Sequence, residues 1–447
     1  MSSVNPTEIE NADAIIFDSV VIESKDFQPT EIAATVTNLD VFEHLDKPYI
    51  TAILGFIDME DVVGTLRLTG GEKVTIRLKG NQEDFFPVIK VFYIDKVLSS
   101  SKIAEHEEFF TFHLIEDHAF ISNTKNVNQV YSGKSSEIVN KIGLDYLGRS
   151  VDSKANDLQQ TKVIVPNLSP IDAMCWIKNR TTTTDGYPFY LYSTFINPYG
   201  DLSFYDLKTM LTAPAMNENK PYTYYESQIS SEDQTSKRRV IIAAEARDTS
   251  DVYALIDEGL IGSEYRYLDI TKNTKDKDQK DKRDNKFTFD VDREVIKKLK
   301  DEDIIKTHPI YQSSKHEWAD EKISSRKISR IGSTQAFDGI KSLSERGNAG
   351  EYRLNEVARS MNKLLTTNPM SFIVNGIDFF NGLDNATIGN KLYVQFIRNL
   401  VPESVDIPFD FNKSGKYLIF ACKHSFTPRE YTLTFSGVKM SNDNEIV

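Results

Sequence analysis

Residues 14–115 carry a succession of short apolar or alternating segments, and this pattern constrains the fold more than any other feature of the chain. Each segment has the length of a single β-strand, and Gly, Asn and Asp residues separate neighbouring segments. The segments are Ala14–Phe17, Glu31–Thr37, Tyr49–Leu54, Lys73–Leu78, Val88–Val97 and Phe109–Ile115. Short strands at this spacing are typical of a β-sandwich or β-barrel. We therefore expect a first β-barrel domain over residues 13–120.

The chain changes character after residue 120, where helical patterns alternate with strand-like segments. A short amphipathic helix is expected with Ser135 or Ser136 as its N-cap, and a second helix begins at Ser169–Pro170, a favourable N-cap and N1 pair. Two aromatic strands then flank a hairpin turn at residues 197–200. These elements predict a compact α+β domain over residues 121–215.

Strand-like segments return near residue 216 and again beyond Pro369, with an amphipathic helix between them. Its apolar residues recur at helical spacing, at Leu354, Val357, Ala358, Met361, Leu364 and Leu365. We expect a second β-barrel domain from residues 216–249 plus 351–447. Residues 250–350 form an insertion that contains the charged loop 272–286. The predicted fold is α+β, mainly β, with an α+β domain between two barrels and an insertion in the second barrel.

The net charge of −13 and the pI near 5.2 argue against nucleic acid as a tightly bound partner. Proteins that grip a nucleic-acid backbone are usually basic, so tight binding to DNA or RNA is not expected. The two cysteines, Cys175 and Cys422, are too few for a disulfide framework or an all-cysteine metal site. The polar N-terminus lacks the pattern of a signal peptide, and no apolar run of about 18 residues predicts a membrane span.

The tetrapeptide Ser132-Gly133-Lys134-Ser135 contains the Gly-Lys-Ser of a phosphate-binding loop and lies between an expected strand and an expected helix. Such a loop needs an earlier glycine so that backbone N–H groups can wrap a phosphate. The matching position is occupied by Asn128. A turn that leads into a helix is therefore the favoured interpretation.

His113 and His118 flank Glu116 and Asp117, which makes a metal site conceivable near the end of the first domain. Residues five apart on one strand point to opposite faces, however, and the spacing suggests no third ligand. Asp58, Glu60 and Asp61 are interpreted as a solvated loop rather than a cation site. The sequence thus predicts no catalytic, cofactor-binding or metal-binding residues, and no enzyme.

Three groups of packing residues resemble a known family. Phe17-Asp18-Ser19 followed by residues 31–37 resembles the N-terminal barrel of the central baseplate hub subunit in T4-like contractile-tailed phages. Residues 133–138, 170–178 and 187–205 resemble the middle unit of the wider hub family, which includes the tube-like part of type VI secretion spikes. The closing segments 414–419 and 423–426 resemble the last strands of the same family. Residues 250–345 have no counterpart.

The resemblance implies a structural role in a virion. Hubs of this family are homotrimers whose two tail-tube-like barrels per chain form a pseudo-hexameric ring between the tail tube and the spike. The expected partners are a spike protein, tail tube or tube-initiator proteins, neighbouring baseplate proteins and a tape measure protein. Genomic DNA would pass through the channel without specific binding, because the surface is acidic. The expected location is the tail baseplate, after assembly in the host cytoplasm.

Two strands are candidates for subunit contacts if they lie at the edges of the barrels. Their residues are Thr51, Ile53 and Phe56 in one strand, and Leu392, Val394 and Phe396 in the other. The alternative, left open, is that both strands are interior. Two other functions also stay open: the hub of a phage-tail-like injection or secretion particle, and a carbohydrate-binding or cell-wall-hydrolysing tail protein.

Overall fold

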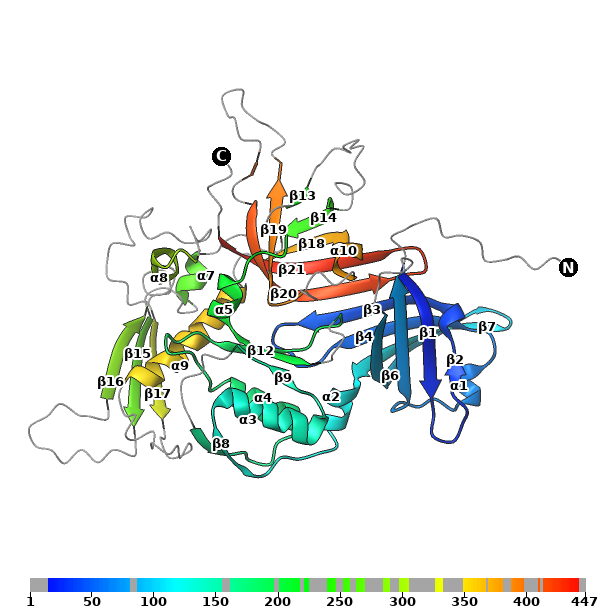
Figure 1. Cartoon of the computed structure of the whole chain (residues 1–447), viewed down its shortest axis with the longest axis horizontal. Coiled ribbons are helices and arrows are strands. Elements are labelled where there is room, and N and C mark those ends of the chain that lie inside the picture. The colour runs from blue at the N-terminus through cyan, green and yellow to red at the C-terminus, as the bar shows by residue number, and fades with distance from the viewer. Residues whose placement is uncertain are drawn as a thin grey trace, which may run out of the picture.

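The structure is dominated by one large, mostly antiparallel sheet (Figure 1). The computed structural model describes residues 15–80, 87–154, 161–196, 201–217, 221–224, 239–246, 252–257, 263–269, 284–289, 297–304, 326–332, 349–366, 369–380, 387–397, 409–410 and 413–441. Among these residues the sheet has 13 strands, and its main path runs β14-β18-β21-β20-β3-β4-β7-β6-β5-β1-β2. Strands from both ends of the chain therefore lie in a single sheet.

The N-terminal part of this sheet is built from segments that alternate apolar and polar residues. The strands are β1 (Ile15–Glu23), β2 (Thr30–Glu31), β3 (Val36–His44), β4 (Thr51–Asp58), β5 (Lys73–Gly80), β6 (Val88–Ala104) and β7 (Glu107–Glu116). Alternation places every second side chain on the same face of a strand. In β3 this buries Leu39 and Val41, and in β4 it buries Leu54 and Phe56. One face of the sheet thus forms the main hydrophobic core.

The expected strand over residues 31–37 is interrupted. After β2 the chain forms a short 3-10 turn, η1 (Ala33–Thr35), before β3 begins at Val36. The Ile32 N–H donates to the Val20 carbonyl, and the Thr35 hydroxyl donates to the Ile32 carbonyl at 3.0 Å. These local bonds satisfy the backbone in the turn, which alternation of residue type alone did not reveal.

The C-terminal strands join the N-terminal ones through a single long pairing. They are β13 (Tyr222–Tyr224), β14 (Ile241–Ala246), β18 (Pro369–Asn375), β19 (Lys391–Phe396), β20 (Gly415–Phe426) and β21 (Tyr431–Ser441). Strand β20 pairs with β21 on one side and with β3 on the other. Two closed barrels were expected; the described strands instead belong to one large sheet in which no closed barrel is found, although β13 bridges back to the start of β14 through Thr223 and Val240. The β20–β3 pairing joins residues that are 377 positions apart (Ala421 and His44) to 387 positions apart (Phe426 and Leu39), beyond the reach of any local sequence pattern.

The middle of the chain forms a unit with its own core beside the sheet (Figure 1). Its helices are α2 (Asp117–Ser122), α3 (Ser135–Ile142), the π-helical turn η2 (Gly143–Leu147), α4 (Pro170–Lys178) and α5 (Leu207–Thr212). Its strands are β8 (Val130–Gly133), β9 (Val151–Asp152), β10 (Thr161–Ile164), β11 (Phe189–Tyr192) and β12 (Leu202–Asp206). As expected, the Ser169 hydroxyl caps α4 by accepting the Asp172 N–H, and Pro170 follows in the first turn.

Strand β11 connects the two cores because it is buried on both faces. Phe189 and Leu191 belong to the core of the middle unit, whereas Tyr190 and Tyr192 belong to the core of the large sheet. All four side chains are at most 4% exposed. The middle unit is therefore packed against the sheet along this strand.

The remaining described elements lie between residues 252 and 380. They are α7 (Val252–Asp257), β15 (Ser263–Asp269), β16 (Asp284–Phe289), α8 (Lys297–Asp301), β17 (Arg326–Gly332), α9 (Ala349–Asn362), the 3-10 turn η7 (Lys363–Thr366) and α10 (Ile377–Phe380); α1 (Val62–Thr65) lies in the first group. Strands β16, β15 and β17 form a small separate sheet. The helix expected over residues 354–365 is present as α9 and η7, with Val357, Ala358 and Met361 buried. Most of the charged loop 272–286, and the hairpin turn at residues 197–200, lie outside the described residues.

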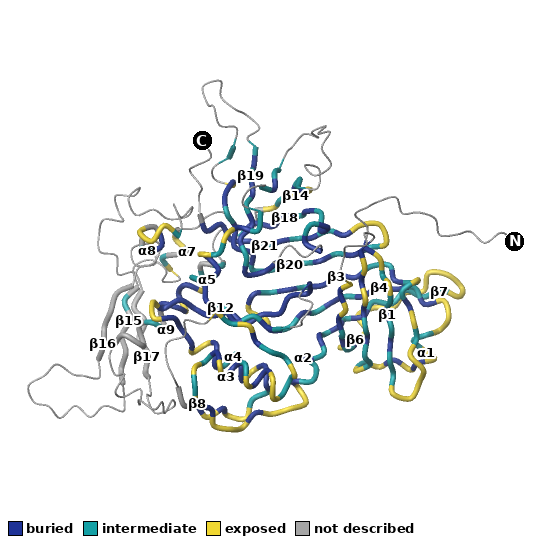
Figure 2. Tube along the Cα trace, viewed as in Figure 1, coloured by how far each residue is buried: buried dark blue, intermediate teal, exposed yellow. Residues whose placement is uncertain are grey.

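Solvent exposure of the residues differs between the centre of the large sheet and the end of its longest hairpin. Figure 2 shows the buried trace concentrated along β3, β4 and β20, and exposed trace at the far end of the β6–β7 hairpin. Residues 95–104 of β6 are all exposed, including Val97, Leu98 and Ile103. In the part of the chain that is described, no helix combines the length and the apolar character needed to cross a membrane.

Candidate functional site: a buried polar junction

The two strands proposed for subunit contacts are interior strands. Strand β4 pairs with β3 and β7, and β19 pairs with β20 and β13. Of the two readings left open, edge or interior, the pairings give the interior one, because β4 and β19 each have a partner strand on both sides. Phe56, Leu392, Val394 and Phe396 are at most 5% exposed and belong to the main core. Only Thr51 and Ile53 lie on a partly exposed face.

The segment that resembles a phosphate-binding loop is a helix start. Gly133 has φ +147°, and α3 begins at Ser135 with Lys134 as the N-cap residue, rather than Ser135 or Ser136. The Glu137 carboxylate accepts the Lys134 N–H at 3.0 Å. Glu137 thus supplies from within the chain the negative charge that a helix N-terminus favours.

The acidic loop after β4 also has a local explanation. The Asp58 carboxylate, which is 6% exposed, accepts the N–H groups of Glu60, Val62 and Val63 at 2.9–3.2 Å. Asp58 therefore fixes the turn into α1 instead of facing solvent as expected.

His113 and His118 are separated because β7 ends between them. The His113 ring pairs with Asp95 at 3.0 Å, whereas His118 lies in α2, next to Glu116 and Asp117. The two histidines thus lie in different elements and have different partners, Asp95 for His113 and the Pro48 carbonyl for His118.

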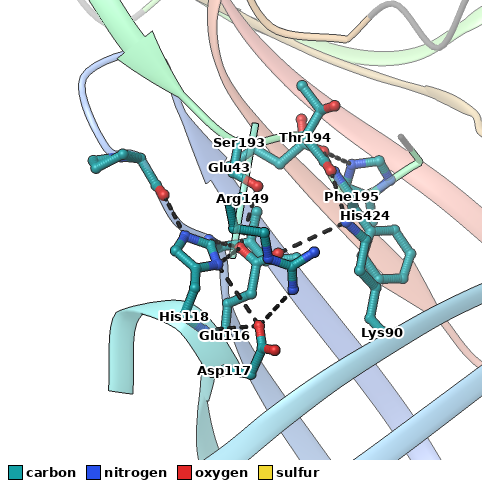
Figure 3. A network of polar contacts seen from close by, with 12 residues as sticks. Glu43, Lys90, Glu116, Asp117, His118, Arg149, Ser193, Thr194, Phe195 and His424 are labelled. Carbon is teal, nitrogen blue, oxygen red and sulfur yellow. Dashed lines mark hydrogen bonds and ion pairs between the residues drawn. The ribbon is translucent and has the colours of Figure 1, made fainter. Parts of the chain in front are cut away.

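The strongest concentration of buried charge surrounds the three residues that follow β11 (Figure 3). The Ser193 hydroxyl donates to Glu116 at 3.2 Å, the Thr194 carbonyl accepts from Lys90 at 3.1 Å, and the Phe195 N–H donates to Glu43 at 2.5 Å. Strands β7, β6 and β3 supply one buried charged side chain each. We call Glu43, Lys90, Glu116 and residues 193–195 the polar junction. It fastens the middle unit to the large sheet.

Glu43 is the best satisfied member of the polar junction. In addition to the Phe195 N–H, it accepts the Thr387 hydroxyl at 2.6 Å and lies 3.0 Å from Nε2 of His424. Burial alone would raise the pKa of the Glu43 carboxyl. The charge of His424 and the hydrogen bonds from Thr387 and the Phe195 backbone outweigh burial and lower this pKa below its usual range.

Glu116 anchors the other end of the polar junction. Its carboxylate accepts the Ile50 N–H at 2.9 Å and lies 3.7 Å from Lys90 and 3.8 Å from Nδ1 of His118. The His118 Nε2 is 2.7 Å from the Pro48 carbonyl. Burial lowers the pKa of His118, but the charge of Glu116 outweighs it and raises this pKa overall.

Asp117 next to this histidine is held ionised. Burial would raise the pKa of the Asp117 carboxyl, yet the hydrogen bond from His118 and the guanidinium of Arg149, 2.7 Å away, lower it to about 2. Every carboxylate at the polar junction thus has donors from the protein, as buried charges require. The arrangement can fix two units in one orientation.

We expect the stability of the protein to fall as the pH rises above 6.5 through the folded pKa of His118. The folded pKa is raised above the ordinary 6.5, so the stabilisation is fully present below that value and is lost at higher pH. Denaturant unfolding at a series of pH values measures this. His118→Gln, which keeps a donor for the Pro48 carbonyl, should flatten the alkaline limb, whereas His106→Gln, at an exposed turn, should not. An unchanged profile in His118→Gln would show that another group is responsible.

The polar junction was not predicted, although the sequence carries a signal for it. Glu43 occupies an inward position of β3, in register with Val41 and Leu45. His424 occupies the equivalent position in β20 between Cys422 and Phe426. A charged residue in an otherwise apolar inward series indicates a buried polar partner. Which partner it meets depends on long-range pairing.

Of three comparisons with known proteins, only the comparison of structures found similar proteins. No family model matches the sequence, and no curated protein matches it. The structure is similar to the 43 kDa tail protein of prophage MuSo2 from Shewanella oneidensis, with a TM-score of 0.51, 10% identity, and coverage of 94% of this chain and 98% of that one.

Two further solved structures resemble the chain less closely. A tail protein from Neisseria meningitidis MC58 has a TM-score of 0.49 and 11% identity, with 95% and 96% of the two chains covered. The E. coli c3393 protein, a component of the type VI secretion system, has a TM-score of 0.42 and 10% identity, with 94% and 77% covered. These solved structures are described as tail proteins and as a secretion-system component. The resemblance to phage tail proteins is thus confirmed at the level of the fold, which this chain shares with the MuSo2 tail protein over nearly the full length of both.

Proposed function

We propose that the chain is a structural baseplate hub, a homotrimer that connects the tail tube to the spike and surrounds part of the DNA channel. One observation carries this proposal: among the described residues, a single sheet runs through both β-rich ends of the chain and leaves an incompletely paired strand at each end, β14 and β1. Two different edges on one chain favour head-to-tail association, and head-to-tail contacts form a closed ring when the rotation permits. The fold shared with a prophage tail protein supports the same conclusion.

One of these edges is β14. It pairs with β18 on one side. On the other side, among the described residues, β13 contacts only Val240, the residue just before β14, through the Thr223–Val240 bridge. The exposed face of β14 carries Ile242, which is 59% exposed. An apolar edge strand with unpaired backbone groups is a template for pairing with another chain.

The other edge is β1. Strand β2 covers only Val21 and Ile22, and Glu31 accepts the Val20 N–H at 2.6 Å. Within the described part of the chain, residues 15–19 pair with β5 alone, and Ile16 is 42% exposed. We propose that this segment of one copy meets β14 of the next. Thr51 and Ile53 stay candidates for contacts across the sheet face.

The electrostatics fit a channel that DNA passes without adhering. A net charge of −13 per chain repels phosphate, and adsorption to DNA grows with the number of phosphates that cations neutralise. The proposed partners are the spike, tail tube or tube-initiator proteins, neighbouring baseplate proteins and the tape measure protein. The proposed site of action is the tail baseplate of the virion, after assembly in the host cytoplasm.

Cross-linking tests the proposed edge contact. In a Cys175→Ser background, the pair Ile16→Cys and Ile242→Cys should give covalent dimers and trimers with a flexible bis-maleimide linker. The matched pair Ile16→Cys and Ile164→Cys should not, because Ile164 is equally accessible, at 65% exposed, but lies in β10 of the middle unit. Equal cross-linking of both pairs, or none in either, would contradict the contact between β1 and β14.

A further inference from the structure

We propose that Glu43, Cys422 and His424 form a binding site for Zn²⁺ or a similar borderline-soft divalent cation inside the sheet. The site goes beyond the proposed structural role, because a hub could assemble with or without it. Carboxylate oxygen, thiolate sulfur and imidazole nitrogen are the ligands that zinc takes in proteins. All three side chains are buried, between 0 and 3% exposed.

The strand register brings the three ligands together. Cys422 in β20 is the direct cross-strand partner of Glu43 in β3. His424 lies two residues further along β20 and therefore points to the same face. One ligand atom from each residue lies within 4.8 Å of the other two. This juxtaposition is enforced by the central pairing of the sheet.

The distance between two of the ligand atoms suits a shared ion. Nε2 of His424 lies 3.0 Å from Oε1 of Glu43. Two ligands that each stand about 2.0–2.2 Å from one zinc ion are separated by a distance of this order. The ring is fully buried, and Nε2 of His424 meets the Glu43 carboxylate as an ion pair whose geometry falls short of an aligned hydrogen bond. A buried ring nitrogen that faces a carboxylate and a thiol without an aligned hydrogen bond is what a coordinating nitrogen requires.

Second contacts hold the ligands in place. Nδ1 of His424 is 2.8 Å from the Tyr431 hydroxyl, so it can donate its proton there while Nε2 coordinates. Glu43 accepts the Thr387 hydroxyl and the Phe195 N–H. Metal-binding histidines and carboxylates are typically oriented by such partners.

Charge favours this cluster over the second group of close ligand atoms, Glu116, Asp117 and His118. When Zn²⁺ binds, the Cys422 thiol releases its proton to solvent, and the thiolate and the Glu43 carboxylate together balance the two positive charges. The cluster of Glu116, Asp117 and His118 also has close ligand atoms. Its carboxylates already have Lys90 at 3.7 Å and Arg149 at 2.7 Å, so an added cation would be repelled.

Cobalt binding tests the site on the full-length chain. Co²⁺ bound by a thiolate gives a charge-transfer absorption, so it reports coordination by cysteine directly. We expect about one Co²⁺ per chain with this absorption, displaced by Zn²⁺. The Cys175→Ser variant should behave the same, since Cys175 lies in α4 of the middle unit. Cys422→Ser should lose the absorption while keeping its circular dichroism spectrum.

The Cys175→Ser protein tests the proposed metal site even if Cys422→Ser does not fold. If the Cys175→Ser protein, in which Cys422 is the one remaining thiol, binds Co²⁺ without a charge-transfer band or does not bind it, the proposal is overturned. Metal content of the protein as purified, measured by mass spectrometry, gives a second reading: zinc near one equivalent supports the site. Neither result depends on trimer formation, so failure here leaves the hub proposal unaffected.

Discussion

Replacing Glu43 by alanine is expected to lower the free energy of unfolding by about 3–5 kcal/mol, measured with excess chelator so that no metal contributes. Removing one member of a buried charged pair leaves its partner without compensation, at a cost of this size. The substitution also leaves the Phe195 N–H and the Thr387 hydroxyl without their acceptor. Denaturant unfolding measures the loss.

Glu430→Ala is the matched control, because that carboxylate lies in an exposed turn between β20 and β21. Surface substitutions of this kind usually change stability by less than about 0.5 kcal/mol. If Glu43→Ala were as mild as Glu430→Ala, the polar junction would contribute little to holding the sheet and the middle unit together.

Replacing Phe195 by alanine is expected to destabilise the protein by a similar amount, about 3–5 kcal/mol. The ring is fully buried, with its centroid 5.3 Å from that of His424 and 5.7 Å from that of Phe426. Its removal leaves a cavity where the segment after β11 meets β20. The same denaturant titration provides the value.

Phe27→Ala serves as its control, since Phe27 is 36% exposed in the loop after β1 and should tolerate the change. The outcome that would contradict the structure is a loss below about 1 kcal/mol in Phe195→Ala, because a large ring in a tightly packed core cannot be removed at so small a cost.

These variants examine how the junction acts in the proposed hub. The middle unit and the sheet have separate cores, which meet along β11 and the polar junction. Apolar contacts alone tolerate sliding, whereas Ser193, Thr194 and Phe195 must each meet a charged group in one arrangement. A part that sits between a tube and a spike needs this kind of fixed orientation.

Much of the local structure could be predicted from the sequence, because local patterns determine it. Period-two alternation located the strands around Val74 and Leu114, and 3.6-residue periodicity located α9. Ser169 and Pro170 marked the start of α4 through cap chemistry that involves neighbouring residues alone. The strand expected over residues 31–37 is interrupted by two hydrogen bonds that alternation does not encode, from the Ile32 N–H to Val20 of β1 and from Thr35 to Ile32.

The topology and the site could not be predicted in the same way. The β20–β3 pairing that turns two expected barrels into one sheet depends on residues such as Cys422 and Glu43, which no local pattern connects. The same pairing decides which strands are edges, and it makes β4 and β19 interior strands, with Phe56, Leu392, Val394 and Phe396 buried and Thr51 and Ile53 on a partly exposed face. The polar junction likewise needs three strands and a segment far along the chain.

The mass of the purified protein in solution, measured by light scattering, tests the central claim most directly. Three chains of 50.9 kDa give a trimer of about 153 kDa, which is the result we expect for a hub that closes through its two sheet edges. A species that stays at 50.9 kDa when the spike and tube proteins are present would contradict the hub, because the open edges at β1 and β14 would then have no partner.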